Sequence, residues 1–173
     1  IQTGFGRTGR MFACEHEGVR PDMVIVGKAL GGGVIPISAA IADQSVMQVL
    51  NPGDHGSTFG GNPLACAVAI ASLRVILDEN LAQRSAELGK YFMDGLSRIQ
   101  SRHVKEIRGK GLFIGVEIKK ESGTARPFCE ALMKEGVLAK ETHSQVIRFA
   151  PPLVIQQSEI DWAVDRVRKV LAT

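Results

Sequence analysis

Lys28 is the residue of this sequence that is best suited to covalent chemistry. It follows the apolar run MVIVG at residues 23–27, and it is the only charged residue between Met23 and Ala42. A lysine forced toward a core loses hydration, which lowers its pKa and populates the neutral amine that condenses with an aldehyde. The glycines at 31–33 leave room beside it for a flat ligand. The alternative is a lysine at a strand end whose side chain reaches water along its stem.

Two other segments could bind anions. The loop HGSTFGGNP at residues 55–63 carries the hydroxyls of Ser57 and Thr58 between glycines, just before a helix-start signal. Hydroxyls and exposed N–H groups at such a place suit a phosphate, although an ordinary turn has the same composition. Arg148 lies in the run VIRFAPP, which is typical of a strand. Its planar guanidinium matches a carboxylate at two points, and an exposed arginine at a sheet edge is the alternative.

Several other patterns do not support a site. Gly4, Gly6 and Gly9 spell GFGRTG, which matches the glycine fingerprint of dinucleotide binding. That fingerprint needs a strand before it and a helix after it, and neither fits here, so we interpret the segment as a glycine-rich turn. The phosphate-loop pattern also fails because Lys28 precedes its glycines. The histidines have no metal-ligand spacing, so no metal site is predicted at His16, His55, His103 or His143.

Composition indicates a folded globular protein. The 173 residues include 21 Lys and Arg against 18 Asp and Glu, and 45% are apolar. The charge of +3 is spread without a long basic run and only 5% of residues are aromatic, so nucleic acid is not an expected partner. No run approaches the ~20 apolar residues of a membrane span. Three cysteines without paired spacing favour the reducing cytoplasm.

The hydrophobic pattern predicts an α/β protein with a domain boundary near residue 79. Buried strands are expected at 23–27 and 34–42, and Asn62–Pro63 predicts the start of a helix that is buried on most sides. A second helix starts at Leu81. The C-terminal elements expected are a half-buried strand at 112–118, a helix at 125–135, strands at 137–140 and 146–150, and a last helix capped by Ser158.

Taken together, Lys28, the GST loop and Arg148 resemble the class III, pyridoxal-phosphate-dependent aminotransferases of fold type I. The resemblance covers the whole chain, in strings that include PDMVIVGKALGGGVIPISA, DHGSTFGGNPLACAVAIASL, IRGKGLFIGVEI and KETHSQVIRFAPPLVI. It implies that residues 1–79 are the C-terminal part of a large cofactor-binding domain, a mixed sheet with flanking helices. Residues 80–173 are then a small α+β C-terminal domain.

The resemblance also implies roles for individual residues. Lys28 would bind pyridoxal 5'-phosphate covalently and later carry the proton that moves during transamination. Gln2 would lie near the ring hydroxyl of the cofactor, while Thr58, with Ser57 beside it, would contact the phosphate held by the neighbouring subunit of a homodimer. Arg148 would bind the α-carboxylate of the amino acid or of 2-oxoglutarate. The strings ETH at 141–143 and RFAPPLVI at 148–155 are most similar to bacterial members that use ornithine, with members that use acetylornithine next.

The sequence departs from the family pattern at its first residue. The family carries an Asp-Glu pair directly before the Ile-Gln that stands here as Ile1 and Gln2, and its Asp keeps the pyridine nitrogen protonated. We therefore expect the 173 residues to be the C-terminal part of a longer polypeptide and inefficient in transamination by themselves. Two alternatives remain: a folded fragment that binds no cofactor, and a nicotinamide-dependent oxidoreductase that uses the opening glycines.

Overall fold

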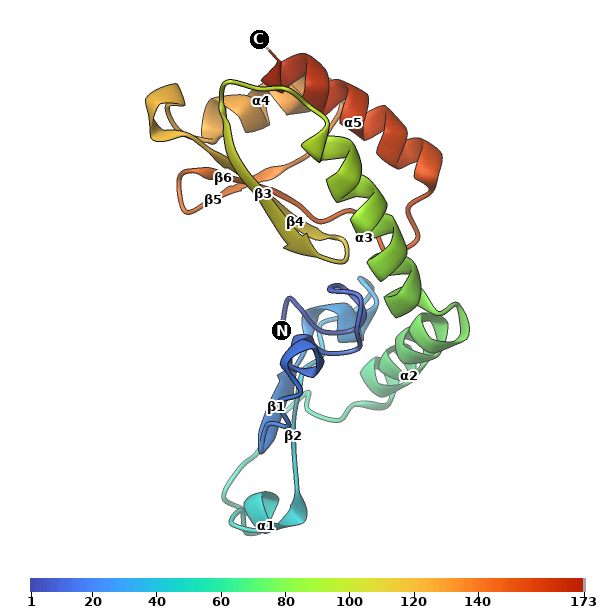
Figure 1. The fold of residues 1–173 in the computed structure, drawn as a ribbon. Helices are drawn as coiled ribbons and strands as arrows, with labels where there is room; N and C mark the ends of the chain where they lie inside the picture. The colour runs from blue at the N-terminus through green and yellow to red at the C-terminus, as the bar shows by residue number, and fades with distance from the viewer. Residues whose placement is uncertain (173) are drawn as a thin grey trace.

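The computed structural model describes residues 1–172, which form an N-terminal part and a C-terminal part built around a sheet (Figure 1). The N-terminal part holds two strands and several helical segments: η1 (Ala13–Glu17), β1 (Met23–Val26), η2 (Lys28–Gly31), β2 (Ala39–Ala42), α1 (Gln44–Met47) and α2 (Pro63–Asp78). The C-terminal part holds the remaining elements: α3 (Leu81–Ser97), β3 (Val104–Lys110), β4 (Phe113–Ile118), η3 (Lys120–Ser122), α4 (Arg126–Lys134), β5 (Lys140–Thr142), β6 (Val146–Phe149) and α5 (Gln157–Leu171).

Strands β1 and β2 form an antiparallel pair that extends away from the rest of the molecule toward α1 (Figure 1). The pairing runs from Met23 opposite Ala42 to Val26 opposite Ala39. The second strand is shorter than predicted, because Pro36 has no N–H to donate to a ladder. The prediction that both strands are buried is wrong within residues 1–172, where Ile25 and Ile41 are exposed. Burial of a strand depends on elements packed against it, and the described residues place none over these faces.

Helix α2 begins where the sequence predicted. The side chain of Asn62 caps it, its Oδ1 accepting a hydrogen bond from the Ala65 N–H at 2.9 Å, and Pro63 occupies the first turn, where no donor is missed. The prediction that this helix is buried on most sides is wrong in the part of the chain described. Its large apolar side chains at Leu64, Ile70 and Leu77 are exposed. Their exposure leaves an apolar surface along α2.

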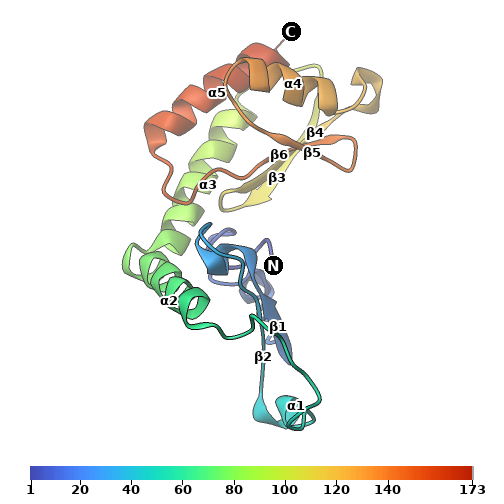
Figure 2. The ribbon, with the colours of Figure 1, turned by 180° about the vertical axis from the view of Figure 1, so that it is seen from behind.

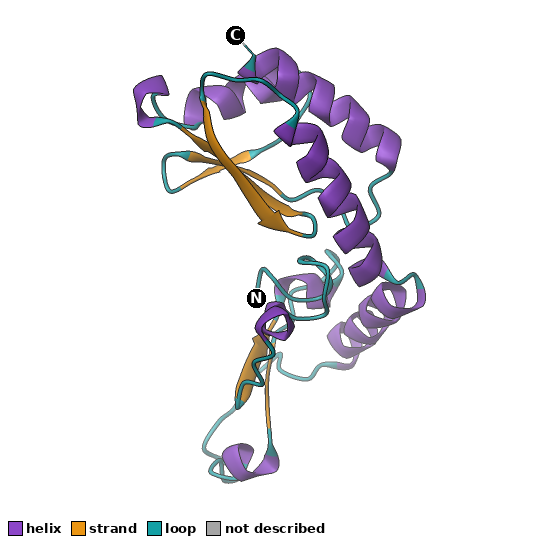
Figure 3. Ribbon diagram, in the orientation of Figure 1, coloured by secondary structure: helices purple, strands orange, loops and turns teal. Residues whose placement is uncertain are grey.

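The C-terminal sheet has the order β3–β4–β6–β5 and is antiparallel throughout. Helices lie along one side of it, as Figures 2 and 3 show. The predicted alternation in β4 is confirmed, because Leu112, Ile114, Val116 and Ile118 are all at most 1% exposed. Strand β3 was not predicted, since its sequence VKEIRGK is mostly charged and its outer face is exposed.

The start of the last helix differs from the prediction. Helix α5 starts at Gln157, so the predicted cap Ser158 lies inside its first turn. Gln156 is the N-cap, and its backbone N–H donates to the Glu159 carboxylate at 2.7 Å. This is one arm of a capping box, in which an acidic side chain at the third helical position satisfies a free N–H group.

The buried apolar side chains of residues 1–172 fall into two clusters. The N-terminal core contains Phe5, Val26, Leu30, Ala69, Ile76 and Leu81. The C-terminal core joins the sheet to α3, α4 and α5, and it includes Phe92, Ile114, Ile147, Ile160 and Val167. Asn80, in left-handed conformation at φ 50°, separates α2 from α3. We propose on this basis that 1–79 and 80–173 are the two domain segments, with Leu81 at the seam.

The two parts meet at a joint of closely packed backbone. A Cβ on Gly89 of α3 would lie 2.1 Å from the carbonyl of Gly111, and a Cβ on Gly111 would lie 2.5 Å from the carbonyl carbon of Thr8. Ser85 completes the joint, because its fully buried hydroxyl donates to the Arg7 carbonyl at 2.9 Å and accepts from the Leu112 N–H at 3.0 Å. The absence of side chains at two glycines therefore lets the turn between β3 and β4 rest on the N-terminal segment.

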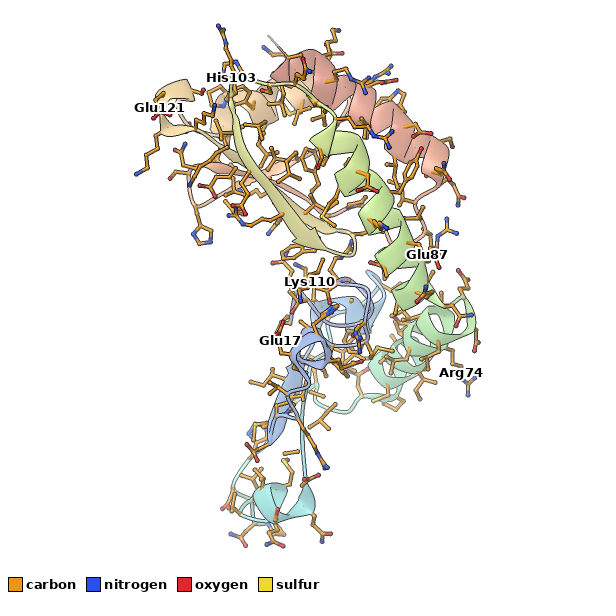
Figure 4. The ribbon with its side chains drawn as sticks, viewed as in Figure 1. Glu17, Arg74, Glu87, His103, Lys110 and Glu121 are labelled. Carbon is orange, nitrogen blue, oxygen red and sulfur yellow. The ribbon has the colours of Figure 1, made fainter. Side chains whose placement is uncertain are left out.

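An ion pair spans the same joint at the surface. Lys110 at the end of β3 lies above Glu17 of η1 in Figure 4, with its Nζ 3.2 Å from a carboxylate oxygen. Both side chains are more than half exposed, so this pair contributes no more than about 1 kcal/mol to the free energy of unfolding. The buried contacts, rather than this pair, hold the two parts together.

Candidate functional site

Lys28 stands directly after β1, as the sequence predicted. It is the first residue of η2, and its backbone is in the left-handed region at φ 54°, which is costly for a residue with a side chain. The prediction that this lysine is forced toward a core is wrong within residues 1–172, because its side chain is exposed. In the same range its Nζ makes no hydrogen bond or ion pair. The described residues therefore present an unpaired amine from a strained backbone position, without burying it.

Two hollows meet at Lys28. The first, which we call the loop hollow, measures about 520 Å³ and is lined by Lys28, by Ser38 and by the 55–62 loop, including His55, Ser57 and Asn62. The second, which we call the lobe hollow, measures about 410 Å³ and lies between the N-terminal part and the end of β6. Lys28 lines both, so a ligand attached to its amine could reach groups in either direction.

The loop hollow contains part of the predicted phosphate site. The Ser57 Oγ lines it and accepts a hydrogen bond from the Gly60 N–H at 3.0 Å, which leaves the hydroxyl proton free to donate. The Asn62 side chain is already used at both ends, by the Ala65 N–H and the Phe59 carbonyl. Thr58 is exposed and does not line this hollow. Of the two predicted hydroxyls, the structure brings Ser57 to Lys28 and leaves Thr58 facing outward.

The lobe hollow brings together the other predicted residues. Gln2, Lys28 and Arg148 all line it, although Arg148 comes from β6 in the C-terminal part. The half-buried Arg148 faces away from the core residues Ile147 and Phe149, and its Nη1 donates to the Gln2 Oε1 at 3.4 Å. The guanidinium and the Lys28 amine thus belong to one hollow. A small molecule with a carbonyl or amino group and a carboxylate could contact both.

The charges around the lobe hollow favour an anion. Its described lining includes three cations, Arg7, Lys28 and Arg148, and no carboxylate. A neighbouring hollow of about 560 Å³ on the sheet side of Arg148 is different, because its other two cations, Arg108 and Lys110, are paired with carboxylates. Arg108 binds the carboxylate of Glu117 at 2.6 Å, and hydrogen bonds from Lys105 and Arg108 lower the pKa of that carboxyl. An anionic ligand therefore meets unneutralised positive charge in the lobe hollow.

Arg7 is a lining residue that the sequence interpretation missed. It belongs to the string GFGRTG, which we interpreted only as a turn, yet the residue lines the lobe hollow. Its Nη1 donates to the carbonyls of Leu112 and Pro151, and burial lowers its pKa from the ordinary value. One feature of the sequence could have indicated this role. Arg7 is the one long side chain among glycines and Thr8 in residues 6–9, so few neighbouring side chains cover it.

The residues present fit pyridoxal phosphate, the cofactor that the resemblance implies. An unpaired primary amine lies where a carbonyl could reach it, and a hydroxyl stands in the adjoining glycine-rich loop, a donor set suited to a phosphate. An amide and a guanidinium stand on the other side. Among residues 1–172, no three His, Cys, Asp or Glu side chains come together as potential metal ligands.

Comparison with known proteins gives a consistent result. A family model described as aminotransferase class-III matches residues 1–171. The ornithine aminotransferase of Geobacillus sp. (strain WCH70) is 62% identical over 172 residues, which cover 99% of this chain and 42% of that protein. The ornithine aminotransferase of Bacillus subtilis (strain 168) is 61% identical, with 99% and 42% covered. The chain therefore spans about two fifths of the length of these curated relatives.

Solved structures share this architecture. The ornithine aminotransferase from Toxoplasma gondii, whose active site is partially occupied by PLP in that structure, superposes with a TM-score of 0.95 at 47% identity. The match covers 99% of this chain and 42% of that one. The acetylornithine aminotransferase from Elizabethkingia anophelis follows at a TM-score of 0.92 and 46% identity, with 99% and 44% covered. No helix in residues 1–172 is long and apolar enough to cross a bilayer.

Proposed function

This chain belongs to the class III aminotransferases, and from that premise we propose that the full-length protein containing it transfers the δ-amino group of ornithine to 2-oxoglutarate. The products are glutamate semialdehyde and glutamate. The observation that carries the proposal is the shared hollow, in which the Lys28 amine and the Arg148 guanidinium face the same space although they come from different parts of the fold. Identities of 62% and 61% to ornithine aminotransferases support ornithine as the substrate.

Pyridoxal phosphate, when bound, supplies an electron-withdrawing ring that stabilises negative charge on the substrate carbon next to nitrogen. The Lys28 Nζ anchors the cofactor and, once freed by substrate, takes a proton from one carbon atom and returns it to another. Gln2, which lines the lobe hollow with Lys28, would provide an amide near the ring hydroxyl. The Ser57 hydroxyl, beside Thr58, would contribute a donor for the phosphate held by the second subunit.

Arg148 binds the substrate carboxylate in this proposal. Its guanidinium provides paired donors in one plane, and the weak bond to Gln2 at 3.4 Å can be exchanged for shorter charge-assisted bonds to a carboxylate. Fixing the carboxylate fixes which end of the substrate meets Lys28. Binding ornithine by its α-carboxylate leaves its δ-amine free to reach the reacting position.

We further propose that the protein acts as a homodimer in the cytoplasm. Exposed large apolar side chains on the N-terminal part support a partner surface, among them Val49, Leu50, Phe59, Leu64 and Ile70. Thr58 stands in the same exposed loop as Phe59, which suits contact with a phosphate held by the second subunit. Cys14, Cys66 and Cys129 are free thiols, as expected in a reducing compartment. Each active site then takes groups from both subunits.

Acetylornithine is the second candidate substrate, because the acetylornithine aminotransferase from Elizabethkingia anophelis superposes almost as well. The test is to measure kcat/KM of the full-length protein for ornithine and for acetylornithine, with 2-oxoglutarate as acceptor. We expect ornithine to be preferred by at least about tenfold, a difference of about 1.4 kcal/mol in transition-state binding. A preference for acetylornithine would reassign the substrate, and absence of turnover with both would reject the proposed reaction.

Replacing Arg148 by alanine tests the carboxylate site. Loss of charge-assisted bonds that contribute about 1.5–3 kcal/mol predicts that kcat/KM falls about 10-fold to 100-fold for both ornithine and 2-oxoglutarate. The visible absorbance of the bound cofactor is expected to remain, because the Lys28 amine is untouched. Steady-state kinetics and absorption spectra of the same preparation measure the two effects.

Lys140→Ala is the matched control for that experiment. Lys140 lies opposite Arg148 in the pairing of β5 with β6, is exposed, and lines none of the three hollows described here. It removes one positive charge next to the site without removing a proposed ligand. Equal effects of the two substitutions on kcat/KM, or loss of cofactor absorbance in Arg148→Ala, would contradict the role assigned to Arg148.

A further inference from the structure

Arg7 makes unusual contacts for a residue in a glycine-rich turn. Its side chain is partly buried, and within residues 1–172 it forms no ion pair with a carboxylate. Instead its Nη1 donates to two backbone carbonyls, those of Leu112 and Pro151, at 3.0 Å and 2.5 Å. Burying a cation without a counter-charge costs free energy. We therefore ask which parts of the structure the two hydrogen bonds of Arg7 hold in place.

One of the two carbonyls belongs to a segment that lines the lobe hollow, since Ala150 and Leu153 on either side of Pro151 line it, whereas Leu112 lies in the turn between β3 and β4. Pro151 follows Arg148 by three residues at the exit of β6, and Leu112 begins the return from β3 to β4. The Arg7 backbone carbonyl is in turn fixed by the Ser85 hydroxyl, so both ends of the residue are tied down. Arg7 therefore connects the chain that leaves Arg148 to the N-terminal segment that carries Gln2.

The position of Arg7 also relates it to the site itself. It lines the lobe hollow together with Lys28 and Arg148, so a displacement of Arg7 changes the lining of that space. Both bonds come from one nitrogen, Nη1, which the planar guanidinium holds in a fixed orientation, whereas the ammonium of a lysine ends a shorter and more flexible stem. Small errors in the placement of a binding group reduce rate and affinity strongly.

We propose that Arg7 is a positioning residue for the carboxylate site: by bonding the Pro151 carbonyl in the segment after β6 and the Leu112 carbonyl in the β3–β4 turn, it sets the placement of the Arg148 guanidinium opposite Lys28. This inference rests on the proposed function, since it concerns the carboxylate that Arg148 binds. Arg7 acts through Arg148 and the local backbone, and Lys28 retains its own chemistry when Arg7 is replaced.

Arg84 provides a matched control within the same fold. Its Nη2 donates to the carbonyls of Ile155 and Val154 at 2.7 Å and 3.4 Å, so it also ties the segment after β6 to another element. It does not line the lobe hollow. Replacing either arginine removes bonds from a guanidinium to backbone carbonyls, and only Arg7 lies at the site. A purely structural role would give the two substitutions the same consequences.

The first experiment compares Arg7→Gln, Arg7→Lys and Arg84→Gln in the full-length, cofactor-loaded protein. For Arg7→Gln we expect KM for 2-oxoglutarate and for ornithine to rise about tenfold, with the cofactor absorbance retained and kcat reduced less than KM is raised. Arg7→Lys is expected to be intermediate, because it keeps the charge and one bond. Arg84→Gln is expected to lower Tm while leaving both KM values unchanged. Equal KM values in Arg7→Gln and Arg84→Gln would overturn the inference.

The second experiment needs no turnover. Glutarate, an unreactive dicarboxylate, is added to the cofactor-free full-length protein, and the rise in Tm with concentration reports its binding. We expect Arg7→Gln to need about ten times more glutarate than the unsubstituted protein or Arg84→Gln for the same rise. An equal response of all three proteins, or no response in the unsubstituted one, would overturn the inference. The attachment of pyridoxal phosphate to Lys28 would be unaffected by that outcome, so failure of the inference is distinct from failure of the proposed function.

Discussion

Lys28→Ala is expected to abolish covalent attachment of pyridoxal phosphate to the full-length protein and to lower transamination by about 10⁴-fold or more, since it removes both the nucleophile and the proton carrier. The visible absorbance of the bound cofactor should disappear. Reduction of the unsubstituted protein with borohydride followed by mass spectrometry should place the cofactor on the peptide that contains residue 28. Lys28→Arg should fail in the same way, because a guanidinium keeps the charge but does not condense with an aldehyde.

Lys28→Gly separates the effect of residue 28 on the reaction from its effect on the stability of the fold. Lys28 holds φ at 54°, where a residue with a Cβ loses about 1–2 kcal/mol and glycine does not. After the extra conformational entropy that glycine loses on folding, Lys28→Gly is expected to raise the free energy of unfolding of the cofactor-free protein by up to about 1 kcal/mol. Lys28→Ala keeps the strain and should give no such gain. Chemical denaturation measures the difference.

Lys90→Ala is the control for the Lys28 substitutions. Lys90 of α3 is an exposed lysine that lines neither hollow. Replacing it by alanine should change neither the absorption spectrum of the cofactor nor the rate of transamination. If Lys28→Ala kept the cofactor absorbance, the amine would not be the point of attachment. If Lys28→Gly were less stable than Lys28→Ala, the left-handed backbone would not be a source of strain, and the stability argument would be wrong.

Gly89→Ala is expected to produce the largest loss of stability among single methyl additions at the joint. The new Cβ would lie 2.1 Å from backbone atoms of Gly111, which is itself close to the Thr8 backbone. Backbone cannot rotate away as a side chain can, so α3, the β3–β4 turn and the N-terminal segment must separate. We expect a loss of about 4 kcal/mol in the free energy of unfolding, despite the gain of up to about 1 kcal/mol in helix propensity.

The matched control is Gly95→Ala in the same helix. Its Cβ would meet a methyl group of Val164 at 3.0 Å, a side chain that can shift, so the helix-propensity gain should offset most of the strain. The free energy of unfolding should therefore change by no more than about 1 kcal/mol. Because the joint packs the N-terminal segment, which also carries Gln2, against the β3–β4 turn, we also expect Gly89→Ala to raise the KM for 2-oxoglutarate at temperatures where the protein remains folded. Equal stability of the two variants would contradict the packing argument.

Local chemistry in the sequence predicted many element boundaries. The start of α2 followed from Asn62 and Pro63, because a cap and a first-turn proline act within a few residues of one another. The alternating burial of Leu112 to Ile118 followed from the period of a strand. Local rules failed where two signals compete, as when Gln156 and Glu159 cap α5 in place of Ser158. Strand β3 escaped prediction because its charged side chains form ion pairs across the outer face of the sheet.

Burial and long-range contact could not be predicted in this way. The apolar residues of β1, β2 and α2 suggested buried elements, but burial depends on what packs against them, and in residues 1–172 much of that surface is open. Arg7 shows the same limit. Its acceptors are the carbonyls of Leu112 and Pro151, which are 105 and 144 residues away along the chain. No local pattern in GFGRTG indicates which distant carbonyls it will meet.

By itself the sequence placed an isolated lysine at position 28, between an apolar strand and three glycines, and predicted that its amine binds an aldehyde. It also predicted that Arg148 stands on a strand, on the face opposite Ile147 and Phe149. Only the tertiary structure decided that these two side chains share one hollow and that Arg7 lies beside them. The reason is physical: the two parts meet through contacts between segments far apart in the chain, among them the close packing of Gly111 on Thr8 and the Arg7 bond to Pro151.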